Sequence, residues 1–142
     1  MNIGSNNAAK TLALDGNTVG NTISGDVTDG INVLSLTKSG TSTWALSGNN
    51  AYTGVTTVSA GTLVLGGTNI GLGATAIVGG TLQASTDGAL NPNSALTLTD
   101  AATAVLDLNG TTNVIGALAG GGAVGGNITL GATTTNTGVL TF

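Results

Sequence analysis

Apolar and polar side chains alternate in short stretches along this chain of 142 residues. In the stretches 96–99 (Leu-Thr-Leu-Thr) and 128–130 (Ile-Thr-Leu), every second side chain is apolar and those between are polar. A period of two places the apolar side chains on one face of a β-strand, so each stretch predicts a strand with one buried face. The pattern leaves no room for the 3.6-residue period of an amphipathic helix.

Turn residues close these stretches at intervals of about ten residues. Glycine and asparagine adopt the positive φ angles that tight corners need. We therefore predict corners at six dipeptides: Asp15-Gly16, Asp29-Gly30, Gly66-Gly67, Gly79-Gly80, Asp87-Gly88 and Asn109-Gly110.

The chain also repeats itself. The stretch 43–48 (Thr-Trp-Ala-Leu-Ser-Gly) recurs 19 residues later as 62–67 (Thr-Leu-Val-Leu-Gly-Gly), since 62 − 43 = 19. The same offset brings Asn50 onto Asn69, and Thr81 begins a third copy. Copies of constant length favour a solenoid of stacked coils over a sandwich. Looser copies begin at Thr11, Val105 and Asn127.

The fold class predicted by these features is all-β: a right-handed parallel β-helix with coils of about 19–23 residues and about six to seven coils. At about 4.8 Å per coil, such a rod would be about 30 Å long. We expect a single domain over residues 1–142, with a short polar stretch at residues 1–10.

The alternation also predicts which side chains fill the interior, whereas the Thr, Ser and Asp residues between them are expected to face solvent. The predicted interior side chains are Leu12, Leu14, Leu34, Leu36, Trp44, Leu46, Val58, Leu63, Leu65, Leu82, Leu98, Leu106, Leu108, Ile128, Leu130 and Leu140.

Composition excludes several classes of protein. The chain is 40% hydrophobic with a net charge of −4, which argues against intrinsic disorder. Its only basic residues are Lys10 and Lys38, so it lacks the cationic patch that binds nucleic acid or anionic membranes. The longest stretch of apolar residues and glycine, 114–126, is too short to span a bilayer. The first ten residues lack the apolar core of a signal peptide.

The residue types of most active sites are missing. The sequence has no His, Cys, Glu or Arg, which removes the usual general base, thiol nucleophile and most metal ligands. Asp26 and Asp29 could form a calcium loop, but turn residues whose carboxylates bind backbone N–H groups are the simpler interpretation. We therefore expect no catalytic, cofactor-binding or metal-binding residues.

Three further alternatives use surface side chains. Asp87, Asp100 and Asp107 could act as the acids of a polysaccharide-cleaving β-helix if they converged, but turn and surface roles explain each of them. Trp44 and Tyr52 could stack on a sugar, although both fit structural positions of the repeat. A Thr-x-Thr ice-binding face would need threonine in most coils, yet the matching positions carry Ala45, Val64, Gln83 and Asp107.

Residues 36–66 resemble a known family. Leu-Thr-Lys-Ser-Gly at 36–40, Leu-Ser-Gly at 46–48, Tyr-Thr-Gly at 52–54 and Ala-Gly-Thr-Leu at 60–63 are similar to the four parts of the autotransporter-associated β-strand repeat, or passenger-associated transport repeat. Trp44 and Val55 depart from the family, which more often carries Leu and Gly at these two positions.

The resemblance implies a parallel β-helix within a secreted or surface-displayed autotransporter passenger, where the repeat aids passage across the outer membrane. It implies no catalytic residues. The partners we expect are neighbouring coils of the parent chain, with no nucleic acid and no transmembrane span. The strand at 138–142 carries no cap, so we also expect head-to-tail self-association into filaments. The alternatives are a fragment of a carbohydrate-active β-helix and the binding surface of an adhesin.

Overall fold

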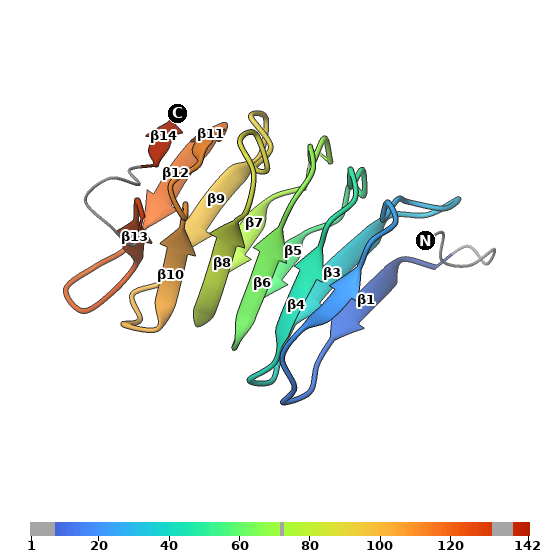
Figure 1. Ribbon diagram of the computed structural model, residues 1–142, viewed down its shortest axis with the longest axis horizontal. Helices are drawn as coiled ribbons and strands as arrows, with labels where there is room; N and C mark the ends of the chain where they lie inside the picture. Colours follow the sequence, from blue (N-terminus) through green and yellow to red (C-terminus); the bar gives the residue numbers. More distant parts are fainter. Residues whose placement is uncertain (1–7, 72, 132–137) are drawn as a thin grey trace.

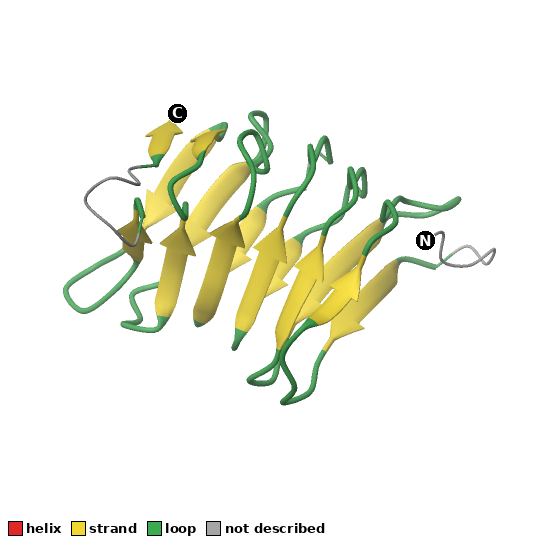
Figure 2. Cartoon of the chain, viewed as in Figure 1, coloured by secondary structure: helices red, strands yellow, loops and turns green. Residues whose placement is uncertain are grey.

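The computed structural model describes residues 8–71, 73–131 and 138–142. Within these residues the chain forms fourteen β-strands and no helix, and turns connect the strands at both edges (Figure 2). Most of the polar stretch predicted at residues 1–10 lies outside the described residues.

Two six-stranded sheets run along the molecule, one in front of the other in the view of Figure 1. The first sheet has the order β1 (Lys10–Leu14), β3 (Leu34–Lys38), β5 (Thr56–Val58), β7 (Thr75–Ile77), β9 (Ala95–Leu98) and β12 (Ala117–Gly120). The second has the order β13 (Asn127–Thr129), β10 (Ala104–Asp107), β8 (Gly80–Ala84), β6 (Thr62–Leu65), β4 (Thr43–Leu46) and β2 (Asn21–Ile23). A further pair joins β11 (Thr112–Val114) to β14 (Val139–Thr141).

The described strand pairs are all parallel, and strands adjacent in a sheet are not consecutive in the chain. The chain therefore winds from one sheet to the other and returns one coil further along. The offset is 19 residues between β4 and β6 and 24 residues between β1 and β3. This confirms the predicted β-solenoid, although the described residues make about five turns rather than six to seven.

The interior is filled by one side chain from every second position, as the alternation predicted. In β3, for example, Leu34 and Leu36 are buried while Ser35 and Thr37 are half-buried on the outer side. Leu12, Trp44 and Leu140 are partly buried against this core. The predicted interior side chains that are fully or almost fully buried are Leu14, Leu34, Leu36, Leu46, Val58, Leu63, Leu65, Leu82, Leu98, Leu106 and Leu108.

The prediction of a buried Ile128 and Leu130 was wrong. Ile128 is 37% exposed and Leu130 is 48% exposed. Ile128 lies in β13, which ends the second sheet and, within the described residues, pairs with β10 alone. An inward side chain of a solenoid is covered by coils on both sides, so a side chain with a single neighbouring strand stays partly open.

Positive φ angles occur at most of the predicted corners. Gly16, Gly67, Gly80, Gly88 and the pair Asn109-Gly110 all have them, and Asn109 is the one described residue other than glycine in this region, with φ 47°. Gly30 is the exception to the prediction, because it is not among the glycines with a positive φ.

Candidate functional site

The lysine of the repeat is buried in a corner between two coils. Lys38 ends β3, is 0% exposed, and its ammonium donates hydrogen bonds to the carbonyl oxygens of Ser39, Gly40 (2.9 Å) and Ala60 (3.1 Å). Ser39 and Gly40 follow Lys38 directly, whereas Ala60 belongs to the next coil. A buried ammonium is tolerated when all of its donors are used, and here they join two successive coils.

Two glycines complete this lysine corner, which we define as Lys38, Gly40 and Gly61. Gly61 has φ +64°, and a Cβ there would lie 2.5 Å from the Gly40 carbonyl oxygen and 2.7 Å from Lys38 Nζ. The Lys-x-Gly and Ala-Gly-Thr-Leu parts of the repeat therefore build the same contact. Burial lowers the pKa of Lys38, and the nearby Asp15 carboxylate opposes this shift.

An asparagine ladder, Asn50, Asn69 and Asn113, joins coils at another corner. Asn50 Oδ1 accepts the N–H of Val27 (3.0 Å), and Asn50 Nδ2 donates to Asn69 Oδ1 (2.6 Å). Asn69 Nδ2 donates in turn to the Ala89 carbonyl oxygen of the following coil. Asn113 repeats the first of these contacts, because its Oδ1 accepts the N–H of Leu90 (2.9 Å). The ladder satisfies backbone groups that the sheets leave unpaired.

Both aromatic side chains proposed above as a sugar-stacking pair are held by hydrogen bonds within the fold. Tyr52 is buried and shares a hydrogen bond of 2.7 Å with Thr56 Oγ1. Burial raises the pKa of Tyr52, and the Thr56 hydrogen bond opposes this shift. Trp44 is half-buried, and its Nε1 donates to the Asp15 carbonyl oxygen (3.0 Å).

The carboxylates considered for calcium bind backbone N–H groups instead. Asp26 accepts the N–H of Asn49 (2.7 Å), and Asp29 accepts those of Leu34 (2.8 Å) and Thr53 (3.1 Å) and the Thr53 hydroxyl. Burial acts to raise the pKa of Asp29, but these hydrogen bonds outweigh it and hold the pKa below its usual value. Within the described ranges, no three acidic side chains gather into a metal-binding group.

The three carboxylates considered for polysaccharide cleavage are engaged at separate places. Asp87, in the turn after β8, accepts the N–H of Thr112 (2.7 Å). Asp100, after β9, accepts that of Val124 (3.0 Å). Asp107, on β10, accepts a hydrogen bond from Gln83 Nε2 (2.7 Å).

The strand register also shows that the row of positions considered for an ice-binding face does not carry threonine. Neighbouring strands of the second sheet, β4, β6, β8 and β10, carry at this position Ala45, Val64, Gln83 and Asp107.

Sequence reasoning missed two features of the site: the burial of Lys38 and the hydrogen bonds of the asparagine ladder. The first had a signal, because Lys38 occupies the same inward parity as Leu34 and Leu36.

Comparison with known proteins identifies these contacts as parts of a repeat. The family model described as passenger-associated-transport-repeat matches residues 36–65 and 60–84. The chain carries the passenger-associated transport repeat. The first matched copy holds the whole lysine corner and Asn50, and the second holds Asn69.

The repeat occurs here in a chain with a relative among autotransporters. The chain is 38% identical over 143 residues to "Adhesin BmaC autotransporter" of Brucella suis biovar 1 (strain 1330). The alignment covers 87% of the chain and 4% of the relative, so the chain corresponds to a small part of that protein. No solved structure matches the chain significantly. Among the described residues there is no helix with the length and apolar character of a membrane span.

Proposed function

We propose that this chain is a non-catalytic structural segment of an autotransporter passenger that forms a rigid β-helical stalk and aids passage across the outer membrane. The observation that carries the proposal is the bonding between coils. Lys38, Asn50 and Asn69 each connect one coil to the next in addition to the parallel strand pairs. Such links resist bending and slippage between coils, as a stalk requires.

The absence of a catalytic role is supported by how the ionisable groups are used. The carboxylates of Asp29, Asp87 and Asp100 each accept a backbone N–H, and the Lys38 ammonium donates to carbonyl oxygens. Groups bound in this way within the scaffold do not offer the paired acid and base of a hydrolase. We also propose that residues 1–142 form a single solenoid unit.

A location outside the cell or on its surface is supported by the passenger repeat and by the relative named as an adhesin. That name also favours a second candidate function, in which the outer face of the solenoid is itself an adhesive surface. Both candidate functions, stalk and adhesive surface, place the repeat in the exported part of its parent protein.

One experiment separates these accounts in the protein that carries this chain. Deleting residues 62–80 removes one whole coil, because Thr43, Thr62 and Thr81 occupy equivalent register positions. We expect the passenger to remain displayed on the cell surface, as judged by antibody labelling of intact cells, and to keep its host-cell binding. A matched deletion of residues 62–71 removes half a coil, breaks the register and should abolish display.

Two outcomes of this pair of deletions would contradict the proposed structural role. Loss of host-cell binding by a fully displayed whole-coil deletion would assign adhesion to this segment and contradict a purely structural role. Equal display of both deletions would show that coil register is irrelevant, and the stalk proposal would fail.

We propose in addition that the isolated segment associates end to end. Within the described residues, β1 and β2 at one end of the solenoid and β12 and β13 at the other each have a single hydrogen-bonded neighbour, which leaves backbone groups available at both ends. With 6% charged residues, the chain has little electrostatic repulsion to keep such edges apart.

A further inference from the structure

A small, partly open cavity lies beside Tyr52, and Gly71 is among the residues that line it. Gly71 follows Tyr52 by the same 19-residue offset that separates Asn50 from Asn69. A Cβ on Gly71 would lie 2.0 Å from the Tyr52 carbonyl oxygen, so the close backbone contact excludes any side chain there. The cavity has a volume of about 40 Å³.

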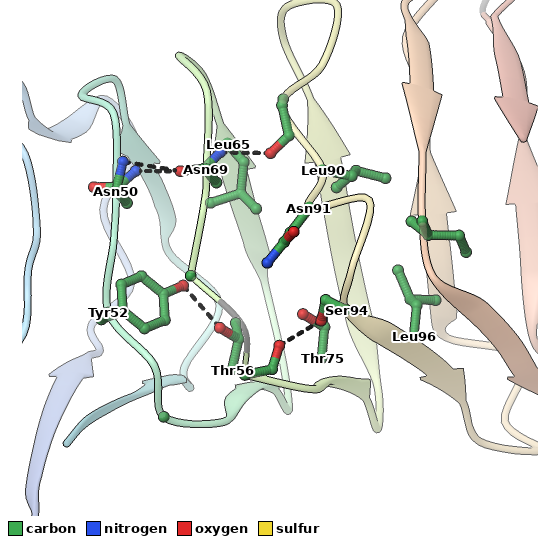
Figure 3. Close-up of a pocket in the computed structure, with 15 residues that line it drawn as sticks. Asn50, Tyr52, Thr56, Leu65, Asn69, Thr75, Leu90, Asn91, Ser94 and Leu96 are labelled. Carbon is green, nitrogen blue, oxygen red and sulfur yellow. Dashed lines mark hydrogen bonds between the residues drawn. The ribbon is translucent and has the colours of Figure 1, made fainter. Parts of the chain in front are cut away.

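The lining of the cavity combines apolar and polar groups (Figure 3). Leu65, Leu90 and Leu96 supply apolar surface, whereas Tyr52 and Thr75 supply hydroxyl groups. The Tyr52 hydroxyl is already bonded to Thr56, but a hydroxyl oxygen has two lone pairs and can accept a further hydrogen bond.

Asn91 has an unsatisfied donor that points into this cavity. Its side chain is 9% exposed, and its Oδ1 accepts the N–H of Asn93 (3.0 Å). Its Nδ2 has no hydrogen-bond partner among the described residues, and Figure 3 shows this nitrogen directed towards the space between Tyr52 and Ser94. A buried amide without a partner is strongly unfavourable, so almost all such groups in proteins are bonded to protein or to ordered water.

We propose that the cavity is an internal water-binding site in which water joins Asn91 Nδ2 to the hydroxyl groups of Tyr52 and Thr75. A buried water needs roughly 10–15 Å³ of such volume and two to four polar partners, so the site has room for about three to four waters. A cavity that binds benzene measures about 150 Å³, which makes this one too small for an aromatic or sugar ring. Water is therefore the ligand that fits both its size and its chemistry.

A high-resolution crystal structure of the 142-residue chain tests the proposal directly. We expect ordered water at hydrogen-bond distance, about 2.7–3.2 Å, from Asn91 Nδ2. Pressurising the crystals with xenon supplies the opposite probe, because dry apolar cavities take up xenon and hydrated polar ones do not. Xenon in the wild-type cavity, empty density, or a protein acceptor bonded to Nδ2 would each overturn the proposal.

Two variants sharpen the test. Asn91→Leu removes the donor, and we expect it to lose the water and gain xenon binding. Asn91→Asp is the matched control, because it keeps the oxygen that accepts the Asn93 N–H and can accept a hydrogen bond from water, so the water should remain. If Asn91→Leu does not fold, Tyr52→Phe removes a partner hydroxyl and should lower the occupancy of the water. Unchanged water in the leucine variant would contradict the assignment to Asn91.

Discussion

Lys38 places a positive charge in the interior of a fold that otherwise relies on aliphatic side chains. It is buried because its four-carbon stem lies among inward-facing residues and its three N–H donors reach three carbonyl oxygens. An ammonium with these contacts stabilises the corner, whereas the same charge without them would disrupt it. The lysine of the repeat thus has a structural explanation that needs no ligand.

The burial of Lys38 predicts a difference in reactivity between the two lysines. An amine-acetylating reagent should modify Lys10, which is half-buried at the start of β1, and leave Lys38 unmodified in the native chain. Mass spectrometry of the digested product measures both sites. Both lysines should react when the chain is first unfolded in urea. Modification of native Lys38 as fast as Lys10 would show that the corner opens in solution.

Asp29 predicts how stability changes at acid pH. Its pKa in the folded state lies below the usual 3.8 because the Leu34 and Thr53 groups favour the carboxylate over the opposing effect of burial. The stability that it contributes is present above pH 3.8 and is lost as the pH falls through the folded-state pKa. The free energy of unfolding can be measured by urea unfolding at several pH values. As the pH falls, it should decrease less in Asp29→Asn than in wild type. Parallel plots of unfolding free energy against pH for the two proteins would contradict this account.

At the scale of the element, glycines at the corners differ in how closely the neighbouring coil approaches them. A Cβ on Gly40 would lie 2.3 Å from Asp15 Oδ1 and 2.4 Å from the Gly16 carbonyl oxygen. Gly88 has a similar φ, +68° against +64° for Gly40, but a Cβ there would meet nothing within 4 Å. Substitution of Gly88 therefore measures backbone strain alone, whereas substitution of Gly40 measures backbone strain together with crowding between coils.

We predict that Gly40→Ala destabilises the chain by clearly more than Gly88→Ala. Placing alanine at positive φ costs about 1–2 kcal/mol at either site. Gly40→Ala adds a clash with the preceding coil, which should bring the loss of unfolding free energy to about 3 kcal/mol or more. Chemical denaturation measures both values. Equal losses would indicate that the coils move apart at little cost.

Strand positions were predictable because period-two alternation fixes the inward side, as Leu34 and Leu36 illustrate. The corners were only partly predictable, since Asp26 and Asp29 were recognised as turn residues but their partners 23 and 24 residues away were not. The cavity beside Asn91 was beyond prediction, because it depends on a close backbone contact between Gly71 and Tyr52. The exposure of Ile128 depends on which strands lie next to β13, and alternation alone carries no such information.

At the scale of the molecule, the open strand edges predict association of the isolated chain. Sedimentation velocity at rising concentration should reveal species larger than a monomer, and electron microscopy should show rods. Val139→Asp places a charge in β14 and should reduce this association. Val124→Asp is the matched control, because Val124 is also exposed but lies outside the strands. A monomer at every concentration would count against end-to-end contacts.

The parallel register has a mechanical consequence for a chain under load. Adjacent coils are spaced by about 4.8 Å, whereas the roughly 20 residues of one coil can extend to about 70 Å when pulled straight. Because each coil is bonded only to its two neighbours, tension along the rod should detach coils from an end one at a time. Single-molecule force spectroscopy should therefore record a series of similar extension steps. In the proposed stalk, such steps would let the chain lengthen in increments under shear while the remaining coils hold the load.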